Sequence, residues 1–139
     1  MTRKDFFKRA GFGAALFLVP TCIGGMMAGC STDGVPIAAP TNIDFTVDIS
    51  TGALSSNGGY ITKNGIVIAR TNQGDFLAVS AACTHDGTYV KYASGSNSFH
   101  CFDHDANFSS TGQHLNGPGS GNLTKYNTEL NGNTLRIFI

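Results

Sequence analysis

The chain contains no tryptophan, and only 13% of its residues are charged. Its formal net charge of zero hides an asymmetry, because four of the nine basic residues lie within the first nine positions. From position 10 onward there are five basic and eight acidic residues, which leaves a formal net charge of −3. Since this mildly acidic part has no basic stripe, the sequence argues against a nucleic-acid partner.

The chain also lacks a helical pattern after its first 30 residues, since no run there repeats apolar residues every 3.6 positions. Apolar and polar residues instead alternate through residues 42–49, as in a half-buried strand. Asn64-Gly65 separates two short apolar runs, as in a hairpin with a type I′ turn. Further strands are expected at residues 60–63, 66–70, 76–80, 89–92, 98–101, 107–108, 123–130 and 134–139. With loops expected at residues 50–59 and 115–121, the sequence predicts one small antiparallel all-β domain.

The first 30 residues have the pattern of an export signal. A basic start precedes an apolar stretch from Ala10 to Gly29, and Met27-Ala28-Gly29-Cys30 resembles a lipobox. We therefore expect residues 1–29 to be a signal peptide and Cys30 to be the lipidated first residue of the mature chain. An uncleaved transmembrane helix is the alternative, but Pro20 and five glycines in that stretch disfavour it.

The basic start resembles a second signal as well. Thr2-Arg3-Lys4-Asp5-Phe6-Phe7-Lys8 is similar to the twin-arginine export motif, with Lys4 in place of the second Arg. The twin-arginine route carries proteins that have already folded around a cofactor, and the ordinary secretory route is the alternative. Either route makes residues 30–41 a lipid-anchored tether, and puts the following domain on the periplasmic or extracellular face of a membrane.

Only two of the four cysteines lie outside the expected signal and its lipid site. Cys83 precedes His85 by two positions, Cys101 precedes His104 by three, and fifteen residues separate the two pairs. Two thiolates and two imidazoles on two loops suit either a structural zinc ion or an iron-sulfur cluster in which two His replace two Cys. A disulfide between the two cysteines is a third interpretation, which leaves the matched histidines unexplained.

The residues around these pairs resemble the Rieske [2Fe-2S] domain. Cys83-Thr84-His85-Asp86-Gly87 matches the motif Cys-Thr-His-x-Gly, and Cys101-Phe102-Asp103-His104 matches most of Cys-Pro-x-His-Gly. Asn116-Gly117-Pro118 is similar to the family's third, proline-containing loop. The resemblance covers residues 42–139 and implies an antiparallel β sandwich of three sheets, with a small cluster-binding subdomain whose two cluster loops form one tip.

The resemblance also implies one [2Fe-2S] cluster per chain, with Cys83 and Cys101 on one iron and His85 and His104 on the other. Some residues depart from the quinol-oxidising members of the family. Thr88 and Asp103 stand where those members have the two cysteines of a disulfide. Ala106 and Phe108 replace two side chains that donate hydrogen bonds, and Asp105 replaces a glycine. Lost donors and added carboxylates predict a reduction potential in the lower part of the Rieske range, about −150 to +300 mV.

The sequence shows no second catalytic group beside the cluster motif. We therefore expect a membrane-anchored, extracytoplasmic electron-transfer protein that carries one electron and exchanges it with redox partner proteins. A Rieske subunit of a larger respiratory oxidoreductase, either quinol-oxidising or a molybdenum enzyme complex, is the alternative. The two remaining histidines, His100 and His114, are expected to be surface or packing residues.

Overall fold

The computed structural model describes residues 38–139, so the expected signal peptide, Cys30 and most of the tether lie outside the described residues. The described residues contain the following elements in chain order: β1 (Asp44–Asp48), the 3-10 turn η1 (Ala53–Ser55), β2 (Tyr60–Lys63), β3 (Ile66–Arg70), β4 (Phe76–Ser80), β5 (Lys91–Ala93), β6 (Ser98–Cys101), β7 (Ala106–Ser109), β8 (His114–Asn116), β9 (Asn127–Asn131) and β10 (Thr134–Phe138). No helix among residues 38–139 has the length and apolar character needed to cross a membrane.

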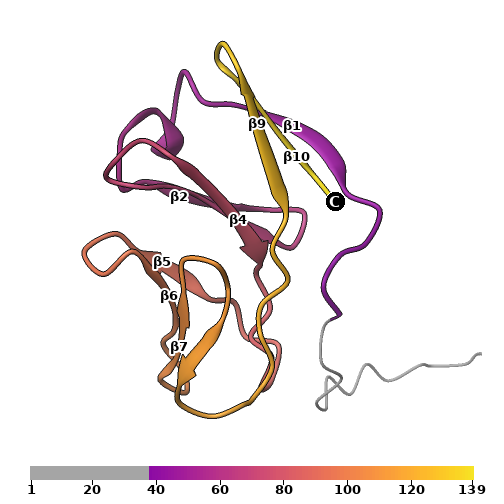
Figure 1. Ribbon diagram of the computed structural model, residues 1–139, viewed down its shortest axis with the longest axis vertical. Helices are drawn as coiled ribbons and strands as arrows, with labels where there is room; N and C mark the ends of the chain where they lie inside the picture. The colour runs from indigo at the N-terminus through magenta and orange to yellow at the C-terminus, as the bar shows by residue number, and fades with distance from the viewer. Residues whose placement is uncertain (1–37) are drawn as a thin grey trace, which may run out of the picture. The chain divides into compact units, whose positions relative to one another are not determined.

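The strands form three antiparallel sheets (Figure 1), with strand orders β1-β10-β9, β2-β3-β4 and β5-β6-β7-β8. The predicted all-β antiparallel architecture is therefore confirmed. The β2–β3 hairpin turns at Asn64 and Gly65, whose φ angles of 53° and 74° are both positive, as a type I′ turn requires. In β1, exposed and half-buried residues alternate, so the pattern at residues 42–49 predicted this strand correctly.

Two predicted strands begin later in the structure. The strand expected at residues 89–92 is β5, which begins at Lys91. Residues 123–130 were expected to form a single strand, but β9 begins only at Asn127. The residues before it hydrogen-bond to β4: Ser80 N donates to Thr124 O (2.8 Å), and Tyr126 N donates to Ala78 O (2.9 Å). The chain thus leaves one sheet and enters another within this segment, which an apolar pattern alone does not indicate.

A second difference lies in the expected loop 115–121, whose first residues belong to β8. Asn107 of β7 pairs with Asn116, and Phe108 pairs with His114 across a register shift. Strand β8 has few apolar residues, because it is the edge of its sheet and its residues are half-buried or exposed. Its membership in the sheet depends on pairing with β7 rather than on a burial pattern.

The described residues have two apolar cores, one on each side of β3. Val67 and Ala69 of β3 pack in the core that also holds both cysteines of the candidate site. Ile66 and Ile68 face the opposite way into a core with Leu135 of β10. Because β3 is buried on both faces, its sequence is continuously apolar. Strands β5 to β8, inserted in the chain between β4 and β9, form the predicted smaller subdomain.

Candidate metal centre

The first cysteine–histidine pair lies in loop 1 (residues 83–88), which follows β4. Cys83 N donates a hydrogen bond to Thr88 O (2.8 Å), and Gly87 N donates to Cys83 O (2.9 Å). Gly87 has a φ of 81°, in the left-handed region that glycine adopts without steric cost. The loop therefore folds back on itself, which leaves Cys83 buried and His85 exposed.

The second pair lies in loop 2 (residues 102–105), the turn of the β6–β7 hairpin, with its cysteine at the end of β6. Cys101 pairs with Ala106, the first residue of β7, so the turn between them is short. Asp105 ends this turn with a φ of 56°. Aspartate enters the left-handed region more readily than most residues, so Asp105 takes a conformation suited to the glycine of the motif. The turn between β6 and β7 therefore forms with aspartate in place of the motif's glycine.

The two loops bring the four predicted ligands together. The ring centroids of His85 and His104 are 4.9 Å apart, and the Sγ atoms of Cys83 and Cys101 lie within 4.8 Å of each other. Both cysteines are free and are 2% and 0% exposed, whereas both histidines are exposed. Two buried sulfur donors beside two exposed nitrogen donors fit the donor set of a Rieske cluster.

Loop 3 (residues 117–121) packs against the other two loops. Thr84 Oγ1 donates a hydrogen bond to Gly121 O (2.9 Å). A Cβ atom added to Gly119 would lie 3.3 Å from the Cβ of His85, and one added to Gly117 would lie 2.6 Å from the Cα of Ala106. The lack of side chains at these glycines lets the third backbone segment approach both ligand loops closely. These contacts agree with the predicted third loop.

Asp86 forms a contact between the loops that the sequence did not predict. Its Oδ1 accepts a hydrogen bond from Thr88 N (3.0 Å) and its Oδ2 accepts one from Thr88 Oγ1 (3.0 Å). Oδ2 also lies 2.9 Å from Nδ1 of His104. The Thr88 N–H contributes most to a lowered pKa of the Asp86 carboxyl. A charged carboxylate therefore lies beside the candidate ligands at neutral pH.

The two thiols have a different electrostatic environment. Burial raises the pKa of the Cys83 thiol, and the neighbouring Cys101 also raises it. Because the thiolate is the form that binds a metal, iron binding at this site must release protons. Binding is therefore favoured as the pH rises.

The residues that depart from the quinol-oxidising pattern lie around the same site. Thr88 holds Asp86 rather than a disulfide partner, and both cysteines within residues 38–139 are free. Ala106 and Phe108 on β7 are both 0% exposed, and their side chains have no hydrogen-bond donor. Loop 1 is thus held by the contacts of Asp86 instead of a disulfide.

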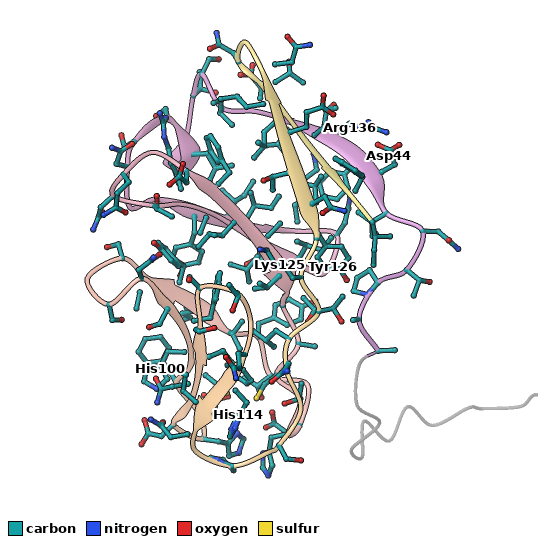
Figure 2. The ribbon with its side chains drawn as sticks, viewed as in Figure 1. Asp44, His100, His114, Lys125, Tyr126 and Arg136 are labelled. Carbon is teal, nitrogen blue, oxygen red and sulfur yellow. The ribbon has the colours of Figure 1, made fainter. Side chains whose placement is uncertain are left out.

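Figure 2 shows His100 and His114 on the four-stranded sheet, with Asp44 and Arg136 near each other on the β1-β10-β9 sheet. His114 packs edge-on against Phe108, with the ring centroids 5.5 Å apart. His100 stacks on Phe102 at 4.5 Å. Both histidines therefore have packing contacts, as the sequence predicted, although His114 lies in a strand and not in a loop.

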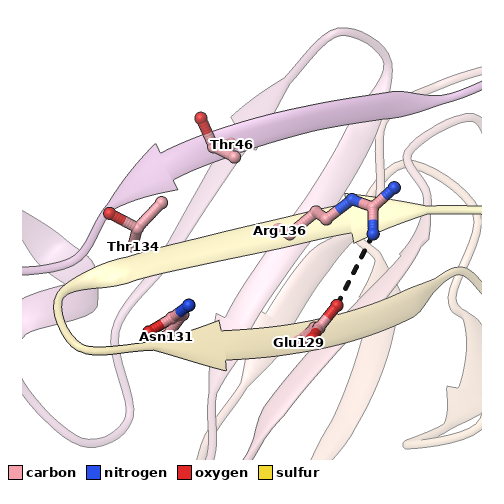
Figure 3. A pocket seen from close by; sticks show the side chains of 5 residues that line it. All are labelled: Thr46, Glu129, Asn131, Thr134 and Arg136. Atoms are coloured by element: carbon pink, nitrogen blue, oxygen red, sulfur yellow. Dashed lines mark ion pairs between the residues drawn. The ribbon is translucent and has the colours of Figure 1, made fainter.

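Two hollows of the described surface lie away from the candidate ligands. One, of about 450 Å³, is lined by polar residues on the outer face of the β1-β10-β9 sheet, where Arg136 Nη1 lies 3.5 Å from Glu129 Oε2 (Figure 3). Arg136 also donates two hydrogen bonds to Asp44, of 2.8 and 2.7 Å, which lower the pKa of that carboxyl. Its guanidinium is thus already paired with carboxylates.

Comparison with known proteins identifies the family. Residues 42–127 match the family model of the Rieske [2Fe-2S] domain. The chain belongs to this family. This Rieske protein carries one [2Fe-2S] cluster, which favours the cluster interpretation of the two cysteine–histidine pairs over the zinc and disulfide interpretations.

Individual relatives agree with the assignment. The chain is 34% identical over 71 residues to the cytochrome b6-f complex iron-sulfur subunit of Chlorobaculum thiosulfatiphilum. That match covers 51% of this chain and only 39% of the relative's length. The crystal structure of the plasma membrane Rieske protein PetC3 from Synechocystis PCC 6803 superposes with a TM-score of 0.56 at 26% identity, covering 68% of this chain and 99% of PetC3.

A ferredoxin of carbazole 1,9a-dioxygenase from Nocardioides aromaticivorans IC177 has the same fold, with a TM-score of 0.54. The match covers 67% of this chain and 96% of the ferredoxin. At 18% identity, this likeness concerns the fold alone.

Proposed function

We propose that this Rieske protein is an extracytoplasmic, membrane-anchored carrier of single electrons. The observation that supports its redox site is the meeting of two buried thiols and two exposed imidazoles from loops 1 and 2. We assign Cys83 and Cys101 to one iron, and His85 and His104 to the other. The cluster supplies one-electron chemistry, while the chain places the histidine side of the site at the surface, where a partner can approach.

The charges around the site set its expected potential. With thiolate and neutral imidazole ligands, the oxidised site is neutral, and the added electron gives it one negative charge. The carboxylates of Asp86, Asp103 and Asp105 disfavour this added charge. We therefore place the reduction potential in the lower part of the Rieske range of about −150 to +300 mV. A value near the top of that range in protein-film voltammetry would contradict the proposal.

Visible absorption and electron paramagnetic resonance of the purified holoprotein test the ligand assignment. Cys83→Ser and His104→Asn should each remove the absorption and the reduced-state signal with low average g, because each deletes a proposed ligand. His114→Gln is the matched control, since His114 packs on Phe108 and should leave both signals intact. Retention of the native signals in both ligand variants would reject the assignment.

The proposed membrane location rests on the sequence of the first 30 residues. Met27-Ala28-Gly29-Cys30 resembles a lipoprotein processing site, and the start resembles a twin-arginine signal. The similarity to PetC3, a plasma membrane Rieske protein, supports a membrane-associated role. We propose that the lipid on Cys30 anchors the mature chain, with residues 30–41 as its tether.

Mass spectrometry of the membrane-extracted protein tests this location. The expected product begins at Cys30 and carries a lipid, and Cys30→Ser should abolish this lipid-modified product. Cys22→Ser is the control, because Cys22 lies inside the segment that is expected to be removed. A chain that still begins near Met1 would overturn the lipoprotein proposal.

A second candidate function is a Rieske subunit of a larger respiratory oxidoreductase. The match to an iron-sulfur subunit of a cytochrome b6-f complex supports this candidate. The buried Ala106 and Phe108 argue against the quinol-oxidising version, because neither side chain donates a hydrogen bond. Stable co-purification with a catalytic subunit from detergent-solubilised membranes would favour the subunit, and recovery of the lipoprotein alone would favour the carrier.

A further inference from the structure

The exposed side of loop 2 carries an aromatic ring next to a proposed ligand. Phe102 is 61% exposed, the highest value among the exposed large apolar side chains within residues 38–139. It directly follows Cys101, which is 0% exposed. The motif has proline at this position, so the phenylalanine enlarges the apolar surface at the tip of the loop.

Contacts on the sheet hold this ring in place. The His100 ring stacks against it with centroids 4.5 Å apart and an interplanar angle of 26°. Lys91 Nζ lies 5.2 Å from its centroid, and Lys91 is the cross-strand partner of His100. His100 Nε2 in turn lies 3.2 Å from Asp105 Oδ1. We call the surface formed by Lys91, His100 and Phe102 the aromatic platform.

An exposed ring that is already ordered is suited to binding a protein. Ordering a side chain at an interface costs conformational entropy. Because the platform contacts already restrict the Phe102 ring, much of that cost is met before a partner binds. Aromatic side chains also frequently dominate the energetics of interfaces. The platform lies beside loop 2, so a partner that covers Phe102 also approaches the proposed ligand His104 two residues along the chain.

We propose that the aromatic platform docks a basic, one-electron redox protein whose cofactor edge is exposed in an apolar patch. This inference rests on the proposed electron-carrier function. Charge complementarity selects the occupant, because Asp86, Asp103 and Asp105 lie in loops 1 and 2, and neither loop contains Lys or Arg. The reduced site adds another negative charge. Lys91 of the platform lies against the ring of Phe102, and the three carboxylates outnumber this single lysine.

The experiment uses cytochrome c of the lysine-rich mitochondrial type as the probe. Reduced holoprotein is mixed with ferric cytochrome c by stopped flow, and one electron passes from each reduced protein to the haem, which becomes ferrous. We expect the second-order rate constant to fall about tenfold or more from low to high salt, as for attraction between opposite charges. We expect Phe102→Ala to lower the rate constant at least about fivefold at fixed salt.

Two controls separate docking from general damage. Leu130→Ala removes another exposed apolar side chain, 51% exposed, on β9 in a different sheet, and should leave the rate constant unchanged. Ferricyanide, a small oxidant that needs no protein interface, should oxidise wild type and Phe102→Ala at the same rate. The paramagnetic resonance spectrum of Phe102→Ala should also match wild type, which shows that loop 2 is intact.

A rate constant with cytochrome c that is independent of salt, or that rises with salt, would overturn the proposal. So would a Phe102→Ala rate equal to that of wild type, or an equal loss in Leu130→Ala. These results would leave the carrier function standing, provided that ferricyanide oxidises the protein. A holoprotein without the two-iron spectrum would instead overturn the proposed function, and the docking proposal with it.

Discussion

Replacing Asp86 by asparagine should raise the reduction potential of this Rieske protein. The carboxylate lies 2.9 Å from Nδ1 of His104 and within 4.8 Å of the sulfur atoms of both cysteines. Asparagine keeps the size of the side chain and an oxygen that can accept the hydrogen bond from Thr88 N. The substitution therefore removes a charge while it preserves the contact that shapes loop 1.

The distance sets the size of the expected shift. A unit charge at 4.8 Å, the bound on the separation of these donor atoms, changes a one-electron potential by about 150 mV at an effective dielectric constant near 20 and by about 40 mV in bulk water. The Asp86 side chain is 29% exposed, and the added electron resides on iron, beyond the ligand atoms. We therefore expect an increase of about 50 to 80 mV at low salt, and a smaller one at high salt.

Protein-film voltammetry of the holoproteins in one buffer measures this shift. Asp103→Asn is the matched control, because Asp103 of loop 2 is not among the residues grouped within 4.8 Å of the candidate ligand atoms, and it should shift the potential by less than half as much. Paramagnetic resonance confirms that each variant retains its cluster. The electrostatic reasoning is refuted by an Asp86→Asn potential equal to or below that of wild type, or by an equal increase in Asp103→Asn.

Three further changes test the packing of the domain. Gly117→Ala should destabilise the holoprotein by about 2 kcal/mol or more in chemical denaturation, because the φ of Gly117 is 90° and an added Cβ would meet neighbouring backbone. Gly95→Ala is the control, since Gly95 has open space around it, and it should cost less than about 1 kcal/mol. Equal losses of stability in the two variants would contradict the argument. Asp105→Gly should keep the native cluster spectrum and change stability by less than about 1 kcal/mol, since glycine adopts the same positive φ; a lost spectrum would show that the aspartate shapes the turn. Burial raises the phenol pKa of Tyr126 and Tyr92 above 10.0. The contribution of these two groups to stability is therefore constant below pH 10 and falls as the pH rises through the folded-state pKa. Tyr126→Phe should lose less stability at alkaline pH than wild type in denaturation measured against pH, and an unchanged alkaline loss would exclude Tyr126 as its source.

The sequence predicted the parts of the site that depend on local spacing. The two pairs Cys83/His85 and Cys101/His104 each lie on one turn, and the strands before them are marked by apolar residues ending at Ser80 and Cys101. The prediction that the two pairs lie together in space depended on the family resemblance, because no local pattern in the sequence indicates which two loops are neighbours.

Other features depend on partners distant in the chain. The segment before β9 hydrogen-bonds to β4 through Thr124 and Tyr126, and its sequence resembles a simple continuation of a strand. Asp86 follows the proposed ligand His85 in the chain, but its contact with His104 depends on where loop 2 lies. Its hydrogen bond to Thr88 N, in contrast, spans two residues and belongs to a turn that aspartate is known to form.

The point where the chain enters the domain would limit the reach of the protein under the lipid-anchor proposal. Tyr126 donates a hydrogen bond to Pro40 O (2.7 Å), Gly65 lies against the Pro40 ring, and Gly65 O accepts from Ala81 N (2.8 Å), two residues before Cys83. The chain therefore enters beside the root of loop 1. With a lipid on Cys30, Pro40 lies no farther than about 35 Å from the anchor, the contour length of ten residues. A partner held in the same membrane would then be confined with the redox tip to a thin layer at the membrane surface, whereas a partner dissolved in the surrounding fluid would gain nothing from the anchor.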